Sequence, residues 1–209
     1  MAVADNLLAL LKEIPSSVRL VAVSKYKPVE DIMAAYQAGQ RRFGENRPLE
    51  LEAKAKALPA DIEWHFIGHL QTNKIKNVIP YAALIESVDS VHLLEAINRA
   101  AGAAGRVVDC LLEVHVAAEE SKTGFSPDEA VEVAAHAADY PNVRLCGIMA
   151  MATNTDDEAR IRADFRAAHE VLMRTGLSEL SMGMSGDWPI AVSEGATIIR
   201  IGSSIFGAR

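Results

Sequence analysis

The first residue whose position suggests covalent chemistry is a lysine that follows an apolar, β-branched segment. Val21-Ala22-Val23-Ser24 is typical of a buried strand, and Lys25 comes directly after it. In a partly dry site, desolvation favours the neutral amine, which can act as the nucleophile that forms a Schiff base. The alternative for Lys25 is a solvated loop lysine, which is our interpretation of Lys27 two residues further on.

Two loops rich in glycine and serine could hold an anion. They cover residues 181–187 and 200–207, each at the end of an apolar segment. Small residues let backbone N–H groups approach an anion closely, and a helix that starts behind such a loop adds unpaired N–H groups and a favourable dipole. The alternative is two tight turns that need glycine only for its positive φ. We favour the anion site, because both loops fall where parallel barrels most often hold a phosphate.

Two further side chains at expected strand ends could contact a ligand. Arg200 is surrounded by isoleucines and must have a partner, either in a buried salt bridge or on a ligand ring nitrogen or acid group. Asn46 offers a neutral hydrogen-bonding group after the second apolar segment. Its neighbours Glu45 and Arg47 fit surface charges equally well.

The histidines give only weak evidence for a metal. His65 and His69 lie four residues apart, but no third ligand follows at metal-site spacing, so we expect core or supporting histidines and no metal. Among the other histidines, only His115 falls at an expected strand end. The acidic loop behind it contains Lys122, which could reach a barrel mouth. The sequence leaves the roles of His115 and Lys122 open.

These residues belong to a chain in which eight short β-rich apolar segments alternate with stretches of helical spacing. The segments are residues 20–24, 41–44, 64–68, 84–88, 107–116, 143–149, 179–182 and 197–201. Alternating strands and helices predict a parallel sheet, because each parallel connection needs a crossover. About 26 residues per unit favours an α/β fold that closes as a single (β/α)8 TIM barrel. An open doubly wound sheet is the alternative, although no G-x-G-x-x-G motif follows the first segment.

Several helix starts are marked by capping residues. Ser126-Pro127-Asp128-Glu129 combines an N-cap, a proline at N1 and a glutamate at N3, which predicts a capping box. We expect the same box at Thr155-Asp156-Asp157-Glu158, before a helix that runs to about Arg174 and stops at Gly176. Pro28 is expected to open a helix just after the first strand.

The composition excludes several classes of protein. The chain has 209 residues, half of them hydrophobic, and a net charge of −7, as in a soluble globular protein. It has no basic field to attract nucleic acid or an anionic membrane, and no apolar run approaches the roughly 20 residues of a membrane span. We expect one domain over residues 1–209, cytoplasmic because the amino end lacks the basic region of an export signal. Cys110 and Cys146 fit small buried hydrophobes.

In order along the chain, these motifs resemble those of the pyridoxal phosphate homeostasis proteins, which look like the N-terminal barrel domain of alanine racemase. The resemblance covers nearly the whole chain, and its most specific motif is residues 64–74. The supporting motifs are Val23-Ser24-Lys25, Phe43-Gly44-Glu45-Asn46, Ser121-Lys122-Thr123-Gly124, Met182-Gly183-Met184-Ser185 and residues 200–207. His115, where the family often has asparagine, and Gly186 with Trp188-Pro189 depart from the pattern, without affecting Lys25.

The resemblance implies pyridoxal 5'-phosphate (PLP) as the cofactor, bound covalently as an aldimine of Lys25. It also implies that Asn46 lies near the cofactor and that Ser185, Gly202 and Ser203 help to hold its phosphate. The expected cofactor-binding residues are Lys25, Asn46, His65, Met182, Ser185, Arg200, Gly202 and Ser203. No catalytic residue is assigned.

The resemblance further implies that Arg200 faces the pyridine nitrogen. An arginine there would hold the nitrogen unprotonated and so weaken PLP as an electron sink. Racemisation also needs a second acid or base, which alanine racemase takes from a tyrosine of its other domain, and 209 residues leave no room for that domain. We therefore expect a monomer that carries or buffers PLP without turnover, with PLP-requiring apoenzymes as candidate partners.

Two alternatives remain open at this point. The chain could be a racemase-like PLP enzyme, with Lys25 as one base and Tyr26 or His65 as the other. It could also dispense with PLP and hold a sugar phosphate in the two glycine-serine loops, as a barrel isomerase does.

Overall fold

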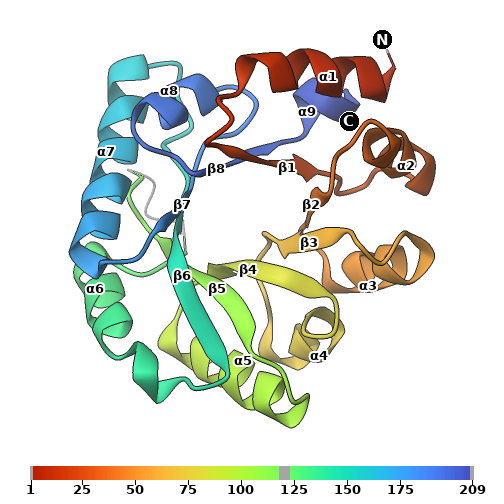
Figure 1. Cartoon of the computed structure of the whole chain (residues 1–209). Helices are drawn as coiled ribbons and strands as arrows, with labels where there is room; N and C mark the ends of the chain where they lie inside the picture. The colour runs from red at the N-terminus through yellow and green to blue at the C-terminus, as the bar shows by residue number, and fades with distance from the viewer. Residues whose placement is uncertain (1, 118–122, 208–209) are drawn as a thin grey trace.

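The computed structural model describes residues 2–117 and 123–207, in which eight parallel strands close into a barrel (Figure 1). Strands that are neighbours in the barrel are also neighbours in the chain, and β8 pairs with β1. The strands are β1 (Arg19–Val23), β2 (Arg42–Glu45), β3 (Glu63–Phe66), β4 (Ala82–Val88), β5 (Val108–Val114), β6 (Val143–Ala150), β7 (Glu179–Ser181) and β8 (Ile198–Ile201). The TIM barrel prediction is therefore confirmed. The open-sheet alternative is wrong, because this sheet has no free edge.

Helices surround the barrel and connect successive strands (Figure 1). They are α1 (Val3–Glu13), α2 (Val29–Gln37), α3 (Pro48–Ala57), α4 (Ile75–Val78), α5 (Val91–Ala103), α6 (Pro127–Ala135), α7 (Glu158–Thr175), α8 (Trp188–Ser193) and α9 (Ser203–Phe206), with 3-10 turns at Thr72–Lys74 and Ala137–Asp139. Within the described ranges, none of them has the length and apolar character of a membrane span. Helix α1 packs on α9, where Asn6 Nδ2 donates to the Ile205 carbonyl at 3.0 Å. This contact supports the last loop from outside.

The structure confirms one predicted capping box and corrects the other. Ser126 Oγ accepts from the Glu129 N–H, and the Glu129 side chain accepts from the Ser126 N–H. At the start of α7, however, the N-cap is Asp157, whose carboxylate accepts from the N–H groups of residues 159 and 160. Thr155 lies outside the helix, where its hydroxyl accepts from the Asp157 N–H at 3.1 Å. Gly176 ends α7 in the left-handed conformation, as predicted.

Two layers of side chains fill the inside of the barrel, one apolar and one polar. The apolar layer is a separate buried cluster of Val21, Leu84, Leu111, Met149 and Ile198. Successive side chains of a strand point to opposite faces, so the residue two positions further on lies on the same inner face, nearer the carboxyl end. Those residues are Val23, Glu86, Glu113, Met151 and Arg200. Three buried charged groups, Glu86, Glu113 and Arg200, thus lie directly below the barrel mouth.

Arg200 and Glu86 are joined within this polar layer. Arg200 Nη1 donates to Ser181 Oγ at 2.6 Å, and Ser181 Oγ donates to Glu86 Oε2 at 2.5 Å. The guanidinium also approaches Glu86 Oε2 directly, at 3.7 Å, and its Nη2 donates to the Ala150 carbonyl at 3.0 Å. The other carboxylate oxygen, Glu86 Oε1, lies 2.5 Å from His65 Nδ1. The buried salt bridge considered for Arg200 is therefore present, and His65 is one of its supports.

The partners of Glu86 decide its ionisation. Burial alone would raise the pKa of Glu86, but the hydrogen bond and charge of His65, the charge of Arg200 and the Ser181 hydroxyl outweigh burial and lower it. Glu86 is therefore ionised at neutral pH and supplies the counter-charge for Arg200.

We predict that Asp157→Ala lowers the free energy of unfolding by about 1 kcal/mol, because the first turn of α7 loses its side-chain cap. Urea denaturation followed by circular dichroism measures the change. The matched control is Asp156→Ala, which removes the same charge from an exposed neighbour that does not cap the helix and should alter stability by less than about 0.5 kcal/mol. Equal losses in both variants would place the cap elsewhere.

We predict that Glu86→Gln lowers the free energy of unfolding by about 3 kcal/mol at pH 7, because Arg200 loses its buried counter-ion. Since the folded pKa of Glu86 lies below the ordinary value of 4.5, its ionisation stabilises the protein above that pH and ceases to do so as the pH falls through the folded pKa. The difference between variant and wild type should therefore shrink below pH 4.5.

Urea titrations at pH 7 and at a pH below 4.5 test this dependence. The control is Glu95→Gln, which changes an exposed carboxylate of helix α5 and should lower stability little at either pH. A Glu86→Gln variant as stable as wild type at pH 7 would show that the pair contributes nothing.

Candidate functional site

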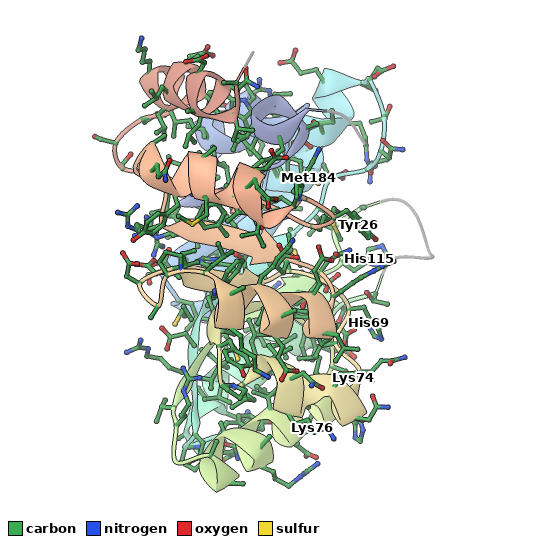
Figure 2. The ribbon with its side chains drawn as sticks, turned by 90° about the vertical axis from the view of Figure 1, so that its right-hand side faces the viewer. Tyr26, His69, Lys74, Lys76, His115 and Met184 are labelled. Atoms are coloured by element: carbon green, nitrogen blue, oxygen red, sulfur yellow. The ribbon has the colours of Figure 1, made fainter. Side chains whose placement is uncertain are left out.

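A cavity of about 370 Å³ opens at the carboxyl ends of the strands. Its lining residues come from five strands (β1, β3, β6, β7 and β8) or from the loops that follow them: Val23, Lys25, Ile67, Met151, Met184, Ser185, Gly186, Arg200, Gly202, Ser203 and Gly207. Figure 2 shows the rim from the side, with Met184, Tyr26, His115 and His69 along one side of the molecule. The structure thus brings together five of the eight expected cofactor-binding residues, namely Lys25, Ser185, Arg200, Gly202 and Ser203.

Lys25 lies in the turn between β1 and α2. Its side chain is partly buried, and its amine has no hydrogen bond or ion pair with any residue in the described ranges. The turn closes through a hydrogen bond from the Lys27 N–H to the Ser24 carbonyl at 3.0 Å. Tyr26, between them, has φ of 64°, a left-handed conformation that is uncommon for a bulky residue.

Lys27 does not behave as the solvated lysine we expected. Its amine donates to the carbonyls of Phe206 and Gly207, at 3.0 and 3.2 Å. A cation at the C-terminus of a helix satisfies carbonyls that lack intrahelical partners, so Lys27 joins the first loop to the end of α9. The lysine turn and the last glycine-serine loop are therefore fixed to each other.

Glycine is required in the first of the two loops that were expected to hold an anion, and space for a side chain is tight in the second. Gly183 has φ of 94°, and a Cβ there would lie 2.6 Å from the Ala191 Cβ, so no other residue fits between β7 and α8. A Cβ on Gly202 would lie 3.2 Å from the Val23 carbonyl oxygen. Ser185 and Ser203 follow these glycines and line the cavity. The Met184 N–H donates to Asp187 Oδ1 at 2.6 Å, which closes the first loop before α8 begins.

Arg200 forms the floor of the cavity, and Glu113 lies beside it in the polar layer. Burial raises the pKa of Glu113; Asp89 raises it further and Arg200 opposes the shift. Burial lowers the pKa of Arg200, while Glu86 and Glu113 oppose that shift, and a guanidinium remains charged throughout the ordinary pH range. The floor therefore presents a cation that donates hydrogen bonds and cannot accept a proton.

Two expected residues, His65 and Met182, are buried and do not line the cavity. His65 lies in the polar layer, where it contacts Glu86. Met182, directly after β7, is fully buried and belongs to the main hydrophobic core. The structure therefore gives His65 a supporting position and Met182 a core position.

Asn46 lies at the rim of a neighbouring hollow of about 550 Å³, which also contains Arg47, His69 and Lys74. Its side-chain oxygen is buried and has no hydrogen-bond partner in the described part of the chain. A buried amide oxygen without a donor is unfavourable, so a ligand group that donates to it would relieve the cost. Asn46 thus remains a candidate contact.

Sequence reasoning missed several buried charges around the site. Glu45, which fitted a surface charge, is fully buried and paired with Lys54, another residue that the sequence analysis did not select. Glu86 and Glu113 were also missed, although each follows an apolar strand residue at a spacing of two. Arg47 is exposed, and its guanidinium lies 4.6 Å from the centre of the Tyr26 ring.

The histidines are engaged separately. His69 Nδ1 lies 3.0 Å from Asp89 Oδ2, apart from His65 and Glu86. Within residues 2–117 and 123–207, no group of three or more histidine, cysteine, aspartate and glutamate side chains could hold a metal ion. His115, whose Nε2 bonds the Ala117 carbonyl at 2.9 Å, lies at the rim. Lys122 lies outside the described residues.

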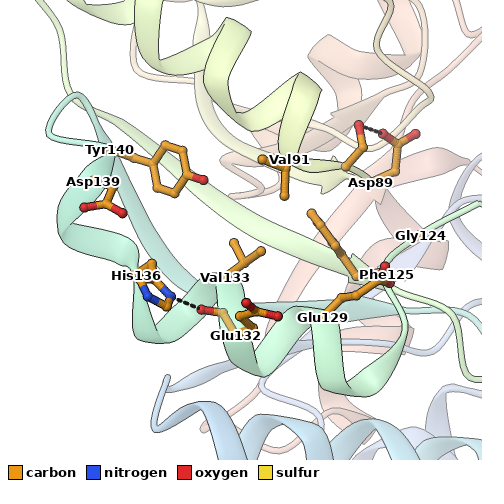
Figure 3. A pocket seen from close by; sticks show the side chains of 11 residues that line it. Asp89, Val91, Gly124, Phe125, Glu129, Glu132, Val133, His136, Asp139 and Tyr140 are labelled. Atoms are coloured by element: carbon orange, nitrogen blue, oxygen red, sulfur yellow. Dashed lines mark hydrogen bonds between the residues drawn. The ribbon is translucent and has the colours of Figure 1, made fainter.

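A larger hollow, of about 580 Å³, lies between α5 and α6 on the side of the barrel (Figure 3). Among its described lining residues are Asp89, Glu129, Glu132 and Asp139, and none is a lysine or arginine. A phosphate there would meet four carboxylates and, among the described lining residues, no lysine or arginine. The cavity above Arg200 is therefore the better candidate for an anionic ligand.

Comparisons with known proteins find relatives that match most of the chain. The "Pyridoxal phosphate homeostasis protein" of Aquifex aeolicus is 40% identical over 198 residues, which cover 91% of this chain and 87% of the relative. The protein of the same name from Haemophilus influenzae is 37% identical over 204 residues, covering 93% and 86%. The solved structure of PipY from Synechococcus elongatus, with PLP bound, is 38% identical, covers 98% of this chain and the whole of PipY, and has a TM-score of 0.89.

More distant structures share the fold alone. Alanine racemase of Clostridium difficile aligns with a TM-score of 0.81 at 14% identity, and the match spans all of this chain but 57% of the racemase. The sequence profile described as "Alanine racemase, N-terminal domain" matches residues 1–209. The chain therefore belongs to the alanine racemase N-terminal domain family and, within it, to the pyridoxal phosphate homeostasis proteins.

Proposed function

We propose that this protein binds PLP in the cavity above Arg200, through a reversible aldimine of Lys25, and that it carries or buffers the cofactor without turnover. The observation that carries the proposal is the pairing, in one cavity, of an amine that has no partner among the described residues and a buried cation that cannot accept a proton. The names of the relatives and the PLP in the PipY structure support the choice of ligand.

The residues present fit this cofactor. Lys25 offers the amine, and the loops containing Ser185, Gly202 and Ser203 offer hydroxyl groups and closely approaching backbone. Arg200 offers guanidinium donors to a ring nitrogen that carries no proton. Asn46 joins the proposed site because its orphaned oxygen needs a donor, such as a ligand hydroxyl.

Reversible condensation of PLP with Lys25 suits a protein that stores the cofactor. PLP supplies an aldehyde that condenses reversibly with a primary amine and releases water. The chain orients Lys25 through its turn, holds the phosphate end through the two loops and limits access of water from below through the apolar layer. Reversible binding of this kind lowers the concentration of free aldehyde and permits later transfer to PLP-requiring apoenzymes, the partners we propose.

Absence of turnover is supported by what lines the cavity. Among its described lining residues, Lys25 and Arg200 are the only side chains that carry an ionisable group, and a guanidinium does not give up its proton. Neither second base of the racemase alternative lines it, since the Tyr26 ring stacks with Arg47 and His65 lies on Glu86. Arg200 beside the ring nitrogen would also weaken the electron sink. We propose that residues 1–209 act as one cytoplasmic, monomeric unit.

We predict that the purified protein develops a visible absorbance band when PLP is added and that Lys25→Ala abolishes this band. Borohydride reduction followed by peptide mass spectrometry should locate the pyridoxyl group on Lys25. The control is Lys76→Ala, which removes an exposed lysine of α4 and should leave the band intact (Figure 2). A band that persists in Lys25→Ala, or an adduct on another lysine, would refute the proposed attachment.

We predict that the PLP-loaded protein incorporates solvent deuterium into the α-carbon of single L-amino acids no faster than free PLP does. The reason is that the described cavity lining offers no second acid or base and that Arg200 opposes protonation of the ring. Proton NMR in deuterated water measures the exchange. Catalytic α-deuteration that disappears in Lys25→Ala would favour the racemase-like alternative.

A further inference from the structure

The turn that carries Lys25 adopts a conformation that its own sequence disfavours. Tyr26 is the one non-glycine residue with positive φ in the described part of the chain. A bulky side chain in the left-handed region crowds the backbone, and such residues persist only where surrounding contacts hold them. The contacts that hold this turn therefore also hold the Lys25 side chain at its present place.

Two hydrogen bonds hold the backbone on the two sides of Lys25. The Ser24 carbonyl accepts from Lys54 Nζ at 2.7 Å, and the Tyr26 N–H donates to Glu50 Oε1 at 2.7 Å. Lys54 Nζ also donates to the same Glu50 oxygen at 2.7 Å, so one hydrogen-bonded chain runs from residue 24 through helix α3 to residue 26.

The third donor of Lys54 anchors this chain to the barrel. Lys54 Nζ donates to Glu45 Oε1 at 2.8 Å, and Ser24 Oγ donates to the same oxygen at 2.6 Å. The ammonium has three N–H groups, and all three are thus used. The Lys54 side chain is 8% exposed and Glu45 is fully buried, so the contacts of Lys54 with Glu45 and with the Ser24 carbonyl are shielded from solvent.

We propose that Lys54, acting with Glu50 and Glu45, is the positioning residue of Lys25. Lys54 does not touch the cavity; it fixes the carbonyl before Lys25 and, through Glu50, the N–H after it, so that the amine faces Arg200 and the two phosphate-holding loops. The inference rests on the proposed function in one respect, the identity of Lys25 as the PLP-binding lysine.

A purely structural role predicts a different outcome. If Lys54 only joined α3 to β2, its loss would lower stability but leave the turn and the Lys25 amine unchanged in the molecules that remain folded. If Lys54 positions Lys25, its loss must also release the amides of the turn and weaken PLP binding. Turn dynamics and binding, measured on folded protein, separate the two roles.

The first test compares Lys54→Met with Lys56→Met, which removes an exposed lysine from the same helix. In protein without PLP, amide hydrogen exchange at Tyr26 and Lys27 should be at least about tenfold faster in Lys54→Met and unchanged in Lys56→Met. In PLP titrations followed by the visible band, the dissociation constant should rise by about tenfold or more in Lys54→Met alone.

The second test needs no change to Lys54 and covers the case in which Lys54→Met does not fold. Glu50→Gln retains a side-chain oxygen that can accept from Tyr26 and Lys54, whereas Glu50→Leu does not. We expect Glu50→Leu to speed exchange and weaken binding by about tenfold and Glu50→Gln to stay within about threefold of wild type. Equal effects of both variants, or none from Glu50→Leu, would overturn the inference.

The two proposals can fail independently. If wild-type protein forms no adduct on Lys25, the proposed function fails, while the exchange measurements still decide whether Lys54 and Glu50 hold the turn. If wild type forms the adduct and Lys54→Met matches it in exchange and in dissociation constant, the positioning role fails alone.

Discussion

A positive charge inside a closed barrel must be neutralised inside that barrel, and Arg200 imposes this requirement on the surrounding strands. Removing a charge from water is costly unless it is paired and hydrogen-bonded. Glu86 on β4, Ser181 on β7 and the Ala150 carbonyl on β6 meet the requirement together, and His65 on β3 holds the second oxygen of Glu86. Barrel closure brings these strands around one residue, so the charge of the cavity floor depends on the complete ring.

Lys54 is a second buried cation, and it contacts the backbone of the turn and not the cavity floor. Lys54 enters from helix α3 and places its charge on the backbone next to Lys25, with Glu45 as the deeper of its two carboxylates. Burial raises the pKa of Glu45, and the hydrogen bond and charge of Lys54 are the main forces that oppose it. One ion cluster therefore sets the electrostatics of the cavity floor, while the other governs the conformation of the chain at its wall.

Local sequence patterns account for the architecture and for the loops of the site. The eight apolar segments correspond to the eight strands, and Lys25, Ser185, Arg200, Gly202 and Ser203 meet in one cavity because parallel strands end on the same side. The same reasoning could have placed Glu86 inside the barrel, because it follows Leu84 by two residues as Arg200 follows Ile198. The partner of Glu86, in contrast, depends on which strands face each other across the closed barrel, which no local pattern encodes.

Other contacts of the structure could not be predicted from the local sequence. Lys54 lies in Glu50-Leu51-Glu52-Ala53-Lys54-Ala55-Lys56, where alternating charges fit a solvated helix face, and only the approach of α3 to β1 gives it a buried role. Lys27 looked solvated because its acceptors, the carbonyls of residues 206 and 207, are about 180 positions away in the chain. Thr155 was the predicted cap of α7, whereas the structure has Asp157 there. Both residue types are good caps, and the Asp157 carboxylate accepts from two backbone N–H groups.

The shared fold does not by itself decide the chemistry of this family. A barrel of the same shape serves alanine racemase at 14% identity, so activity must be argued from the residues at the mouth. There, the floor cation stays charged across the ordinary pH range, and its counter-ion Glu86 has a lowered pKa, so the Arg200–Glu86 pair keeps its charges near neutrality. An ion pair that neither gains nor loses protons is a poor partner for α-proton transfer but gives a ligand constant electrostatics.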